Sequence, residues 1–319
     1  MSSKKLNKIF NKLIIFLVIV IIGLFSKEQI LDKTEDNKET TNNNIVDSTL
    51  EIYFFDVGQA DSILIKEKDY TMLIDGGNQS DGENLVKYLQ EELNVNDIDI
   101  LVGTHPHEDH IGGLPNVISS LDIGTIYLPN ATTTTKIFEK LLDAIADKEY
   151  KITVPKIDEE INLNNMNFKV LYTGTDESDL NNTSIVLKLE YGKTSYLFTG
   201  DATDKTEEKI IDKDIEADVL KIGHHGSSYS STESFLNKVK PKYAIIQVGN
   251  DNKYDHPTKT TLDKLNERNI KIYRTDENGT IKLTSDGTNI NFETIDTNID
   301  GWYNVYGRKN RGQYCYFRR

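Results

Sequence analysis

The chain has 319 residues and a formal net charge of −14, and 28% of its residues are charged. This length and composition fit one large globular domain or two modest ones, and the negative charge argues against a protein that coats DNA or RNA by neutralising many phosphates. The single cysteine, Cys315, excludes an intramolecular disulfide framework and a cysteine zinc site within this sequence. Any metal must therefore be held by His, Asp and Glu side chains.

The first 26 residues form a separate segment of the sequence. Four lysines between positions 4 and 12 precede the apolar run 13–25, a pattern typical of a secretory signal or a signal anchor. No A-x-A-like cleavage site follows, so we expect an uncleaved membrane anchor, with a cleaved signal and a secreted protein as the alternative. The lysines should stay inside, which places the rest of the chain outside the cytoplasm.

Three further regions follow from composition. Residues 27–48 are polar and rich in Asn, Thr and Glu, which predicts a flexible linker. Residues 49–297 carry the apolar patterns of a folded domain. Residues 298–319 are aromatic and basic, so we interpret them as either a surface-binding tail or an irregular end without a role.

The domain alternates predicted strands and helices. Residues 49–77 hold three short β-branched and aromatic runs, and the spacing of apolar residues predicts a helix over 82–93. Further strands are expected at 97–104, 123–129, 166–174, 217–227, 242–249 and 271–275. Further helices are expected at 113–121, 135–148, 202–214, 231–240 and 258–269, and hairpins at 183–201 and 278–295. This order predicts an α/β fold with two sheets sandwiched between helices.

Half of the six histidines lie in "HPHEDH", residues 105–110, at the end of a predicted strand. His105 and His107 are two positions apart, so in extended backbone their side chains point the same way and can meet one cation. Asp109 and His110 follow where the chain turns, and can face a second cation. Imidazole and carboxylate ligands suit Zn, Mn or Fe.

The segment "THPHEDHIGG" resembles the signature of the metallo-β-lactamase superfamily. The order of "FFDVGQADSILI", "LIDGG", "THPHEDHIGG", "NNTSIVLKL", "LFTGD", "LKIGHHGS" and "HP" is similar, more specifically, to the hydrolase domain of ComEC-type DNA-uptake (competence) proteins and their stand-alone relatives. The resemblance covers roughly residues 49–296. It implies an αββα four-layer sandwich with two metals at the edge of the sheets.

The resemblance also implies a ligand set. His105 and His107 would bind the first metal, Asp109 and His110 the second, and Asp201 in "LFTGD" would bridge both. For Asp201, a helix N-cap is the alternative interpretation.

The pair "HH" at 224–225 should supply one more ligand to the second metal. Similarity to the choline-phosphate esterases of this superfamily favours His225, which leaves His224 near the substrate or behind the ligands. His256 would act as a proton donor or a phosphate contact, or else would cap a helix that begins at Pro257.

The sequence departs from the lactamase and glyoxalase pattern at one point. Those enzymes place another ligand histidine before the bridging aspartate, whereas no histidine lies between His110 and His224 here. The ComEC-like branch resembles this chain in that respect. The first metal would then be open to substrate, which argues against β-lactam hydrolysis.

The remaining candidates are polar residues near predicted strand ends. Asp56 and Asp75 are expected to contact the metal ligands from behind. Asn182, Thr183 and Ser184 are expected to reach a substrate phosphate.

Together these patterns predict an extracytoplasmic hydrolase with two divalent metal ions, Zn or Mn, that cleaves phosphodiesters through a metal-activated water. Asp109 would orient that water, and His224 or His256 would protonate the leaving oxygen. Nucleic acid or a phosphodiester envelope polymer would be the substrate. Hydrolysis of a thioester, sulfate or choline-phosphate ester, and a non-catalytic metal-binding module, are the alternatives.

Overall fold

The computed structural model describes residues 46, 48–175 and 178–295. The predicted anchor at 1–26, nearly all of the predicted linker and the tail at 298–319 lie outside these residues. Within the part of the chain that is described, no helix combines the length and the apolar character needed to cross a bilayer. The anchor, the linker, the tail and the domain boundaries therefore stay predictions.

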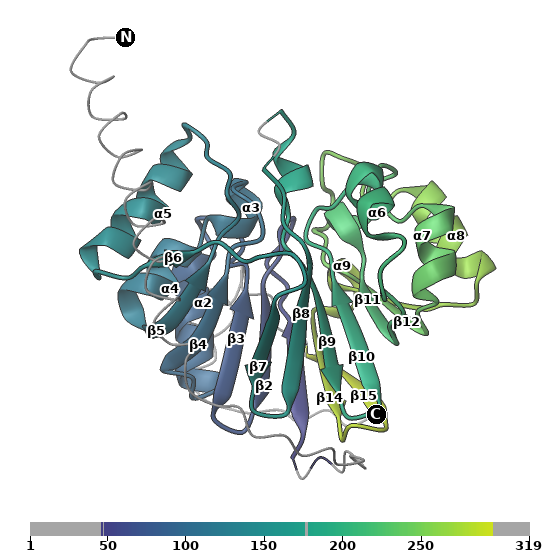
Figure 1. The fold of residues 1–319 in the computed structure, drawn as a ribbon, viewed down its shortest axis with the longest axis horizontal. Helices are drawn as coiled ribbons and strands as arrows, with labels where there is room; N and C mark the ends of the chain where they lie inside the picture. Colours follow the sequence, from purple (N-terminus) through teal and green to yellow (C-terminus); the bar gives the residue numbers. More distant parts are fainter. Residues whose placement is uncertain (1–45, 47, 176–177, 296–319) are drawn as a thin grey trace.

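The described residues contain a first sheet of eight strands (Figure 1). The four strands of one half, β3 to β6, run parallel to one another, and the strands of the other half pair antiparallel. In sheet order the strands are β15 (Ile290–Ile295), β14 (Thr280–Ser285), β1 (Leu50–Phe54), β2 (Ile63–Glu67), β3 (Tyr70–Ile74), β4 (Asp97–Val102), β5 (Asp122–Tyr127) and β6 (Ile152–Thr153).

A second sheet of seven strands faces the first within the described residues. Strands β10 to β13 are parallel and β7 to β10 antiparallel. In sheet order they are β13 (Lys271–Arg274), β12 (Tyr243–Ile246), β11 (Val219–Lys221), β10 (Thr194–Phe198), β9 (Val186–Tyr191), β8 (Met166–Tyr172) and β7 (Glu160–Leu163).

Helices cover the outer face of each sheet (Figure 1). The first sheet is covered by α2 (Gly82–Lys87), α4 (Leu114–Ser120) and α5 (Lys136–Asp147), and the second by α6 (Asp204–Ile210), α7 (Glu233–Val239) and α8 (Lys259–Glu267). The longest of them, α5, begins where the Thr135 side chain accepts a hydrogen bond from the Phe138 N–H, because this cap satisfies a backbone donor that the helix itself leaves free.

Among the described residues, three apolar clusters fill the spaces between these layers. The period of two along a strand explains how β1 serves two of them: Leu50, Ile52 and Phe54 pack between the sheets, while Tyr53 packs under the helices of the first sheet. The third cluster lies between the second sheet and its helices. The structure thus has the predicted two sheets between two helical layers.

The predicted elements differ from the structure at several places. The helix predicted over 82–93 is α2 followed by a π-helical turn, η1 (Tyr88–Glu92). Helix α8 begins after Thr258, whose side chain accepts from the Thr261 N–H, so His256 does not cap a helix starting at Pro257. Strands β6 and β7 were not predicted, because one has two residues and the other lies in a mostly polar run.

Phe54 tests the layer between the sheets. Its ring lies 6.4 Å from that of Phe198 in the facing sheet, and both side chains are buried. Phe54→Ala should lower the free energy of unfolding by about 3–5 kcal/mol, because it removes a buried ring and leaves a cavity. Urea titration should show a lower midpoint with an unchanged slope. Tyr70→Ala, at a ring that is 42% exposed, is the control and should change stability by less than about 0.5 kcal/mol.

Candidate metal centre

The predicted ligands come from the ends of three strands. "HPHEDH" follows β4 of the first sheet, Asp201 follows β10 of the second, and the histidine pair follows β11. Strands β3 to β6 are parallel to one another, as are β10 to β13, and the carboxyl ends of parallel strands meet at one edge of a sheet. The two sheets therefore contribute ligands to one site at their common edge.

The histidine motif turns from extended backbone into the single-turn helix α3 (Glu108–Ile111). His107, just before it, is extended, so His105 and His107 point the same way and His105 Nε2 lies 3.0 Å from His107 Nδ1. The turn packs tightly against residues 76–79: a Cβ on Gly113 would lie 2.1 Å from the Gly76 carbonyl oxygen. Only glycine permits this approach, which brings Asp109 and His110 round toward Asp201.

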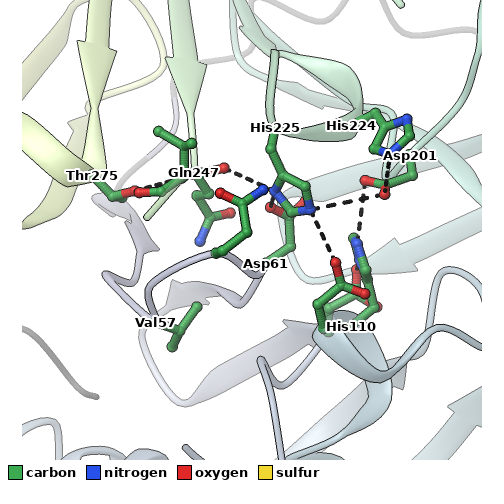
Figure 2. A network of polar contacts seen from close by, with 12 residues as sticks. Val57, Asp61, His110, Asp201, His224, His225, Gln247 and Thr275 are labelled. Atoms are coloured by element: carbon green, nitrogen blue, oxygen red, sulfur yellow. Dashed lines mark hydrogen bonds and ion pairs between the residues drawn. The ribbon is translucent and has the colours of Figure 1, made fainter. Parts of the chain in front are cut away.

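Asp201 is the centre of the site and is 1% exposed. His110 Nε2 lies 3.2 Å from its Oδ1 (Figure 2). Three more imidazole nitrogens approach its Oδ2. These are the Nε2 atoms of His224 at 3.7 Å and of His105 and His225 at 3.9 Å each. The carboxylate thus lies within 4 Å of predicted ligands of both metals, as a bridging ligand must.

Four residues form a compact group of potential ligands: Asp109, His110, Asp201 and His225. One ligand atom from each lies within 4.8 Å of all the others. His110 Nε2, His225 Nε2 and Asp201 Oδ1 are buried and have no hydrogen-bond partner. Buried polar atoms in folded proteins are rarely left without a partner, and three of them converging from imidazole and carboxylate fit a divalent cation.

Asp75 supports His110 from behind. Its Oδ2 lies 2.8 Å from His110 Nδ1, and it also accepts hydrogen bonds from the Thr104 N–H and hydroxyl, both at 2.7 Å. An ionised carboxylate can accept hydrogen bonds but cannot donate one, so His110 Nδ1 carries the proton that it shares with Asp75, and Nε2 faces Asp201. Asp56, the other candidate for such a role, instead accepts from the Gly58 N–H at 3.2 Å, within its own turn.

Three residues behind His225 were not assigned to the site in the sequence analysis: Gln247, Asp61 and Lys221. The imidazole Nδ1 lies 2.9 Å from the Gln247 carbonyl oxygen and 3.3 Å from Asp61 Oδ1, so Nδ1 donates and Nε2 is directed toward Asp109 and Asp201 (Figure 2). Lys221 lies behind Asp61, with a fully buried side chain whose Nζ is 2.7 Å from Asp61 Oδ2. A lysine inside the apolar run "VLKIG" was the one signal in the sequence.

Charge within the site shifts the pKa values of the imidazoles in opposite directions. Burial and the charge of His110 hold the pKa of His105 well below its usual value. Burial alone would also lower the pKa of His225, but Asp201 and Asp61 outweigh it and raise that pKa to about 10. Asp201 and Asp75 likewise raise the pKa of His110 well above the usual value, against the effect of burial. Without metal, His110 and His225 therefore carry the protons that balance the carboxylates.

A cavity of about 530 Å³ opens beside the site. Six of the predicted residues line it: His107, Asp109, Asp201, His224, His225 and His256. The rings of His224 and His256 lie 5.6 Å apart on its wall. Burial and repulsion by His224 lower the pKa of His256 to about 4, so its ring is neutral at pH 7.

Three predicted substrate contacts do not line this cavity. The Asn182 amide oxygen accepts from the Thr203 and Thr206 hydroxyls, and the Thr183 hydroxyl donates to the Leu180 carbonyl. Ser184 Oγ accepts from the Asp201 N–H at 3.1 Å. In this segment, Asn181 lines the cavity instead, and its Oδ1 is buried without a hydrogen-bond partner.

The raised pKa values predict that metal binding competes with protons. A divalent cation must displace the protons of His110 and His225, so its affinity should rise with pH from 6 toward 10 and about two protons should be released near pH 7. Calorimetric titration of the metal-free protein in buffers of different ionisation enthalpy measures that number. Binding heats that do not depend on the buffer would contradict this charge assignment.

Comparison with known proteins agrees with the fold. Residues 55–249 match the family model of the metallo-beta-lactamase superfamily. ComE operon protein 3 of Bacillus subtilis is 31% identical over 252 residues, which are 73% of this chain and 32% of that protein. Competence protein ComA of Neisseria gonorrhoeae is 28% identical over 72% of this chain and 31% of its own length. The chain thus spans about a third of the length of these curated relatives.

Among solved structures, the metallo-beta-lactamase fold protein YhfI from Bacillus subtilis superposes with a TM-score of 0.50 at 13% identity, over 72% of this chain and 96% of that one. This similarity shows the fold alone. The family model, the two facing sheets and the histidine motif at their edge lead to one conclusion: the chain belongs to the metallo-β-lactamase superfamily, whose members are generally metal-dependent hydrolases.

Proposed function

We propose that the protein is a metal-dependent phosphodiesterase. The observation that carries this proposal is the group Asp109, His110, Asp201 and His225, with unpartnered buried atoms at the wall of an open cavity. His105 Nε2 approaches Asp201 Oδ2 at 3.9 Å and lies 3.0 Å from His107 Nδ1, which adds a second set of potential ligands at the same carboxylate, as a two-metal site requires. The similarity to proteins named for competence supports nucleic acid as the substrate, and an envelope phosphodiester polymer is the alternative.

Bound divalent cations would acidify a water molecule and neutralise charge on the phosphoryl oxygens. The side chains around them divide the remaining tasks. Asp109 is 30% exposed at its side chain and faces the cavity while its Oδ2 lies 3.4 Å from His225 Nε2, so it can hold and orient the attacking water. Asn181 and Lys253 line the cavity and can contact the phosphate.

The leaving oxygen needs a proton, and two histidines line the cavity wall. His256 is neutral at pH 7, because burial and its histidine neighbours lower its pKa to about 4, and it therefore suits a hydrogen-bond contact to phosphate. His224 is the proton donor that we propose. Its Nε2 lies 3.7 Å from Asp201 and its side chain is 25% exposed toward the cavity.

The location and the tether are part of the same proposal. The lysine-flanked apolar run 13–25 supports a domain held outside the cytoplasm. Protease added to intact cells should then degrade the domain, and a domain protected until the cells are lysed would contradict this location.

The function is tested with the full-length chain loaded with Mn²⁺ or Zn²⁺. It should hydrolyse bis-p-nitrophenyl phosphate, and Asp109→Asn should lower kcat by about 100-fold or more, because a positioned base or orienting group contributes that much. Asp97→Asn, at the exposed start of β4, is the matched control and should keep full activity. Equal activity in all three proteins would refute the mechanism.

A substrate panel separates the competing functions. Thioesters, sulfate esters and phosphocholine esters should be cleaved more slowly than phosphodiesters by the same metal-loaded protein. Preferential cleavage of one of those esters would reassign the activity, and failure to cleave any of them would favour a non-catalytic metal-binding module.

The proton-donor role is tested by changing the leaving group. His224→Gln should slow cleavage of a dinucleotide by about 10–100-fold, because its alkoxide leaving group needs a proton. The same variant should change the cleavage of bis-p-nitrophenyl phosphate little, because p-nitrophenolate leaves without one. Equal losses on both substrates would assign His224 to binding or to metal retention.

A further inference from the structure

We infer that the two metal positions have unequal affinities, with a tight inner position at Asp109, His110, His225 and Asp201 and a weak outer position at His105, His107 and Asp201. This inference rests on the metal dependence of the proposed function but not on the phosphodiester substrate. The two positions share Asp201, so the difference must come from their other residues.

The inner position is assembled before any cation binds. Its four ligand atoms lie within 4.8 Å of one another. His110 is fully buried and His225 is 2% exposed, and the Nε2 atoms of both lack a hydrogen-bond partner. A cation entering here takes the place of the protons on His110 and His225 among side chains that already converge, and preorganisation of this kind raises affinity.

The outer position offers a cation fewer converging ligands. Among the described residues, His105 and His107 belong to no group of three or more potential ligands whose atoms lie within 4.8 Å of one another. His105 Nε2 and His107 Nδ1 face one another at 3.0 Å, and these two nitrogens therefore satisfy each other without a cation. A cation must break that contact and then has two imidazoles and the shared carboxylate as ligands.

The residues behind the imidazoles reinforce the difference. Asp75 lies 2.8 Å from His110 Nδ1, and Asp61 lies 3.3 Å from His225 Nδ1. A carboxylate at Nδ1 fixes the ring and makes Nε2 a stronger ligand. His105 Nδ1 instead faces two neutral hydroxyls, of Thr104 at 3.2 Å and of Ser184 at 3.5 Å.

Lys221 balances the charge of Asp61, the carboxylate that lies behind His225. Asp61 and Asp201 are both buried beside His225, so a second carboxylate there would otherwise add an unbalanced buried charge, which is costly. The Lys221 ammonium lies 2.7 Å from Asp61 Oδ2 and compensates that charge, while Oδ1 faces His225. Asp61 and Lys221 are therefore positioning residues for the inner metal.

The consequence is a protein that holds one cation at rest. The second cation binds at the outer position, where His107 lines the open cavity together with Asn181 and where a substrate phosphate can complete the coordination.

The test is a Zn²⁺ titration of the metal-free, full-length chain, followed by calorimetry. We expect two binding steps that differ at least about 10-fold in Kd. His225→Ala should abolish the tighter step and His107→Ala only the weaker one. After gel filtration in metal-free buffer, wild type and His107→Ala should each retain about one zinc and His225→Ala should retain none, as measured by atomic emission.

Two results would overturn the inference: steps of equal affinity in the wild type, or loss of the tighter step in His107→Ala with its retention in His225→Ala. Circular dichroism verifies that both variants fold. Because the readout is metal content, a protein with two unequal steps and no hydrolysis would refute the proposed function and leave this inference standing.

A second pair of variants tests the support without removing a ligand. Asp61→Asn leaves Lys221 buried without its counter-charge, so it should also lose folding stability. The double variant Asp61→Asn/Lys221→Met restores neutrality and should regain that stability. In the double variant the tighter Kd should still be weakened by about 10–100-fold, with the weaker step unchanged. An unchanged Kd of the tighter step in a folded double variant would show that Asp61 has a purely structural role. It would overturn the argument that Asp61 strengthens His225 as a ligand.

Discussion

The structure depends on the buried negative charge of Asp201. The side chain is almost completely enclosed, at the edge where the two sheets meet, and water cannot solvate it there. Burial would raise the pKa of this carboxyl, but His110 and His225 outweigh burial and hold it well below its usual value. An ionised carboxylate in such a place needs compensating positive charge, from imidazolium protons in the metal-free protein and from cations in the loaded one. The histidines around it therefore serve charge balance and metal binding with the same atoms.

This constraint explains why the site lies where the layers converge. A single sheet could not surround one carboxylate with four imidazoles, because side chains on one face of a sheet point in one direction. Strand β4 brings His105 and His110 from the first sheet, and β10 and β11 bring Asp201 and His225 from the second. The apolar layer between the sheets, with Phe54 against Phe198, fixes the distance between these two groups. Packing far from the ligands thus determines the ligand geometry.

The parts of this arrangement that are local in sequence could be predicted, and the parts that arise from tertiary contact could not. The spacing of His105 and His107 at a strand end fixes a shared direction for the two side chains, and the β-branched, aromatic and other apolar runs in β1 and β4 identify buried strands. Of the two strands that were missed, β6 has only two residues, and β7 alternates polar and apolar residues but is four residues long within a polar run. Asp61 and Lys221 are separated by 160 positions in the sequence, and only the fold brings them together behind His225. Asn182 was expected at the substrate because it is polar and near the motif, yet its amide is used by Thr203 and Thr206.

The segment 180–184 shows how the absence of one histidine shapes the chemistry. The superfamily resemblance leads one to expect a third imidazole for the outer metal before Asp201, and here the segment supplies a hydroxyl and an amide. Ser184 accepts from the Asp201 N–H and lies near His105 Nδ1, so it positions two ligands without adding charge or a donor to the metal. Asn181 meanwhile lines the cavity, and its side-chain amide NH2 group is the part of it that can donate a hydrogen bond. A coordination position that the protein leaves open, beside an amide that can contact substrate, is suited to a phosphate oxygen, because phosphate both ligates a hard cation and accepts hydrogen bonds.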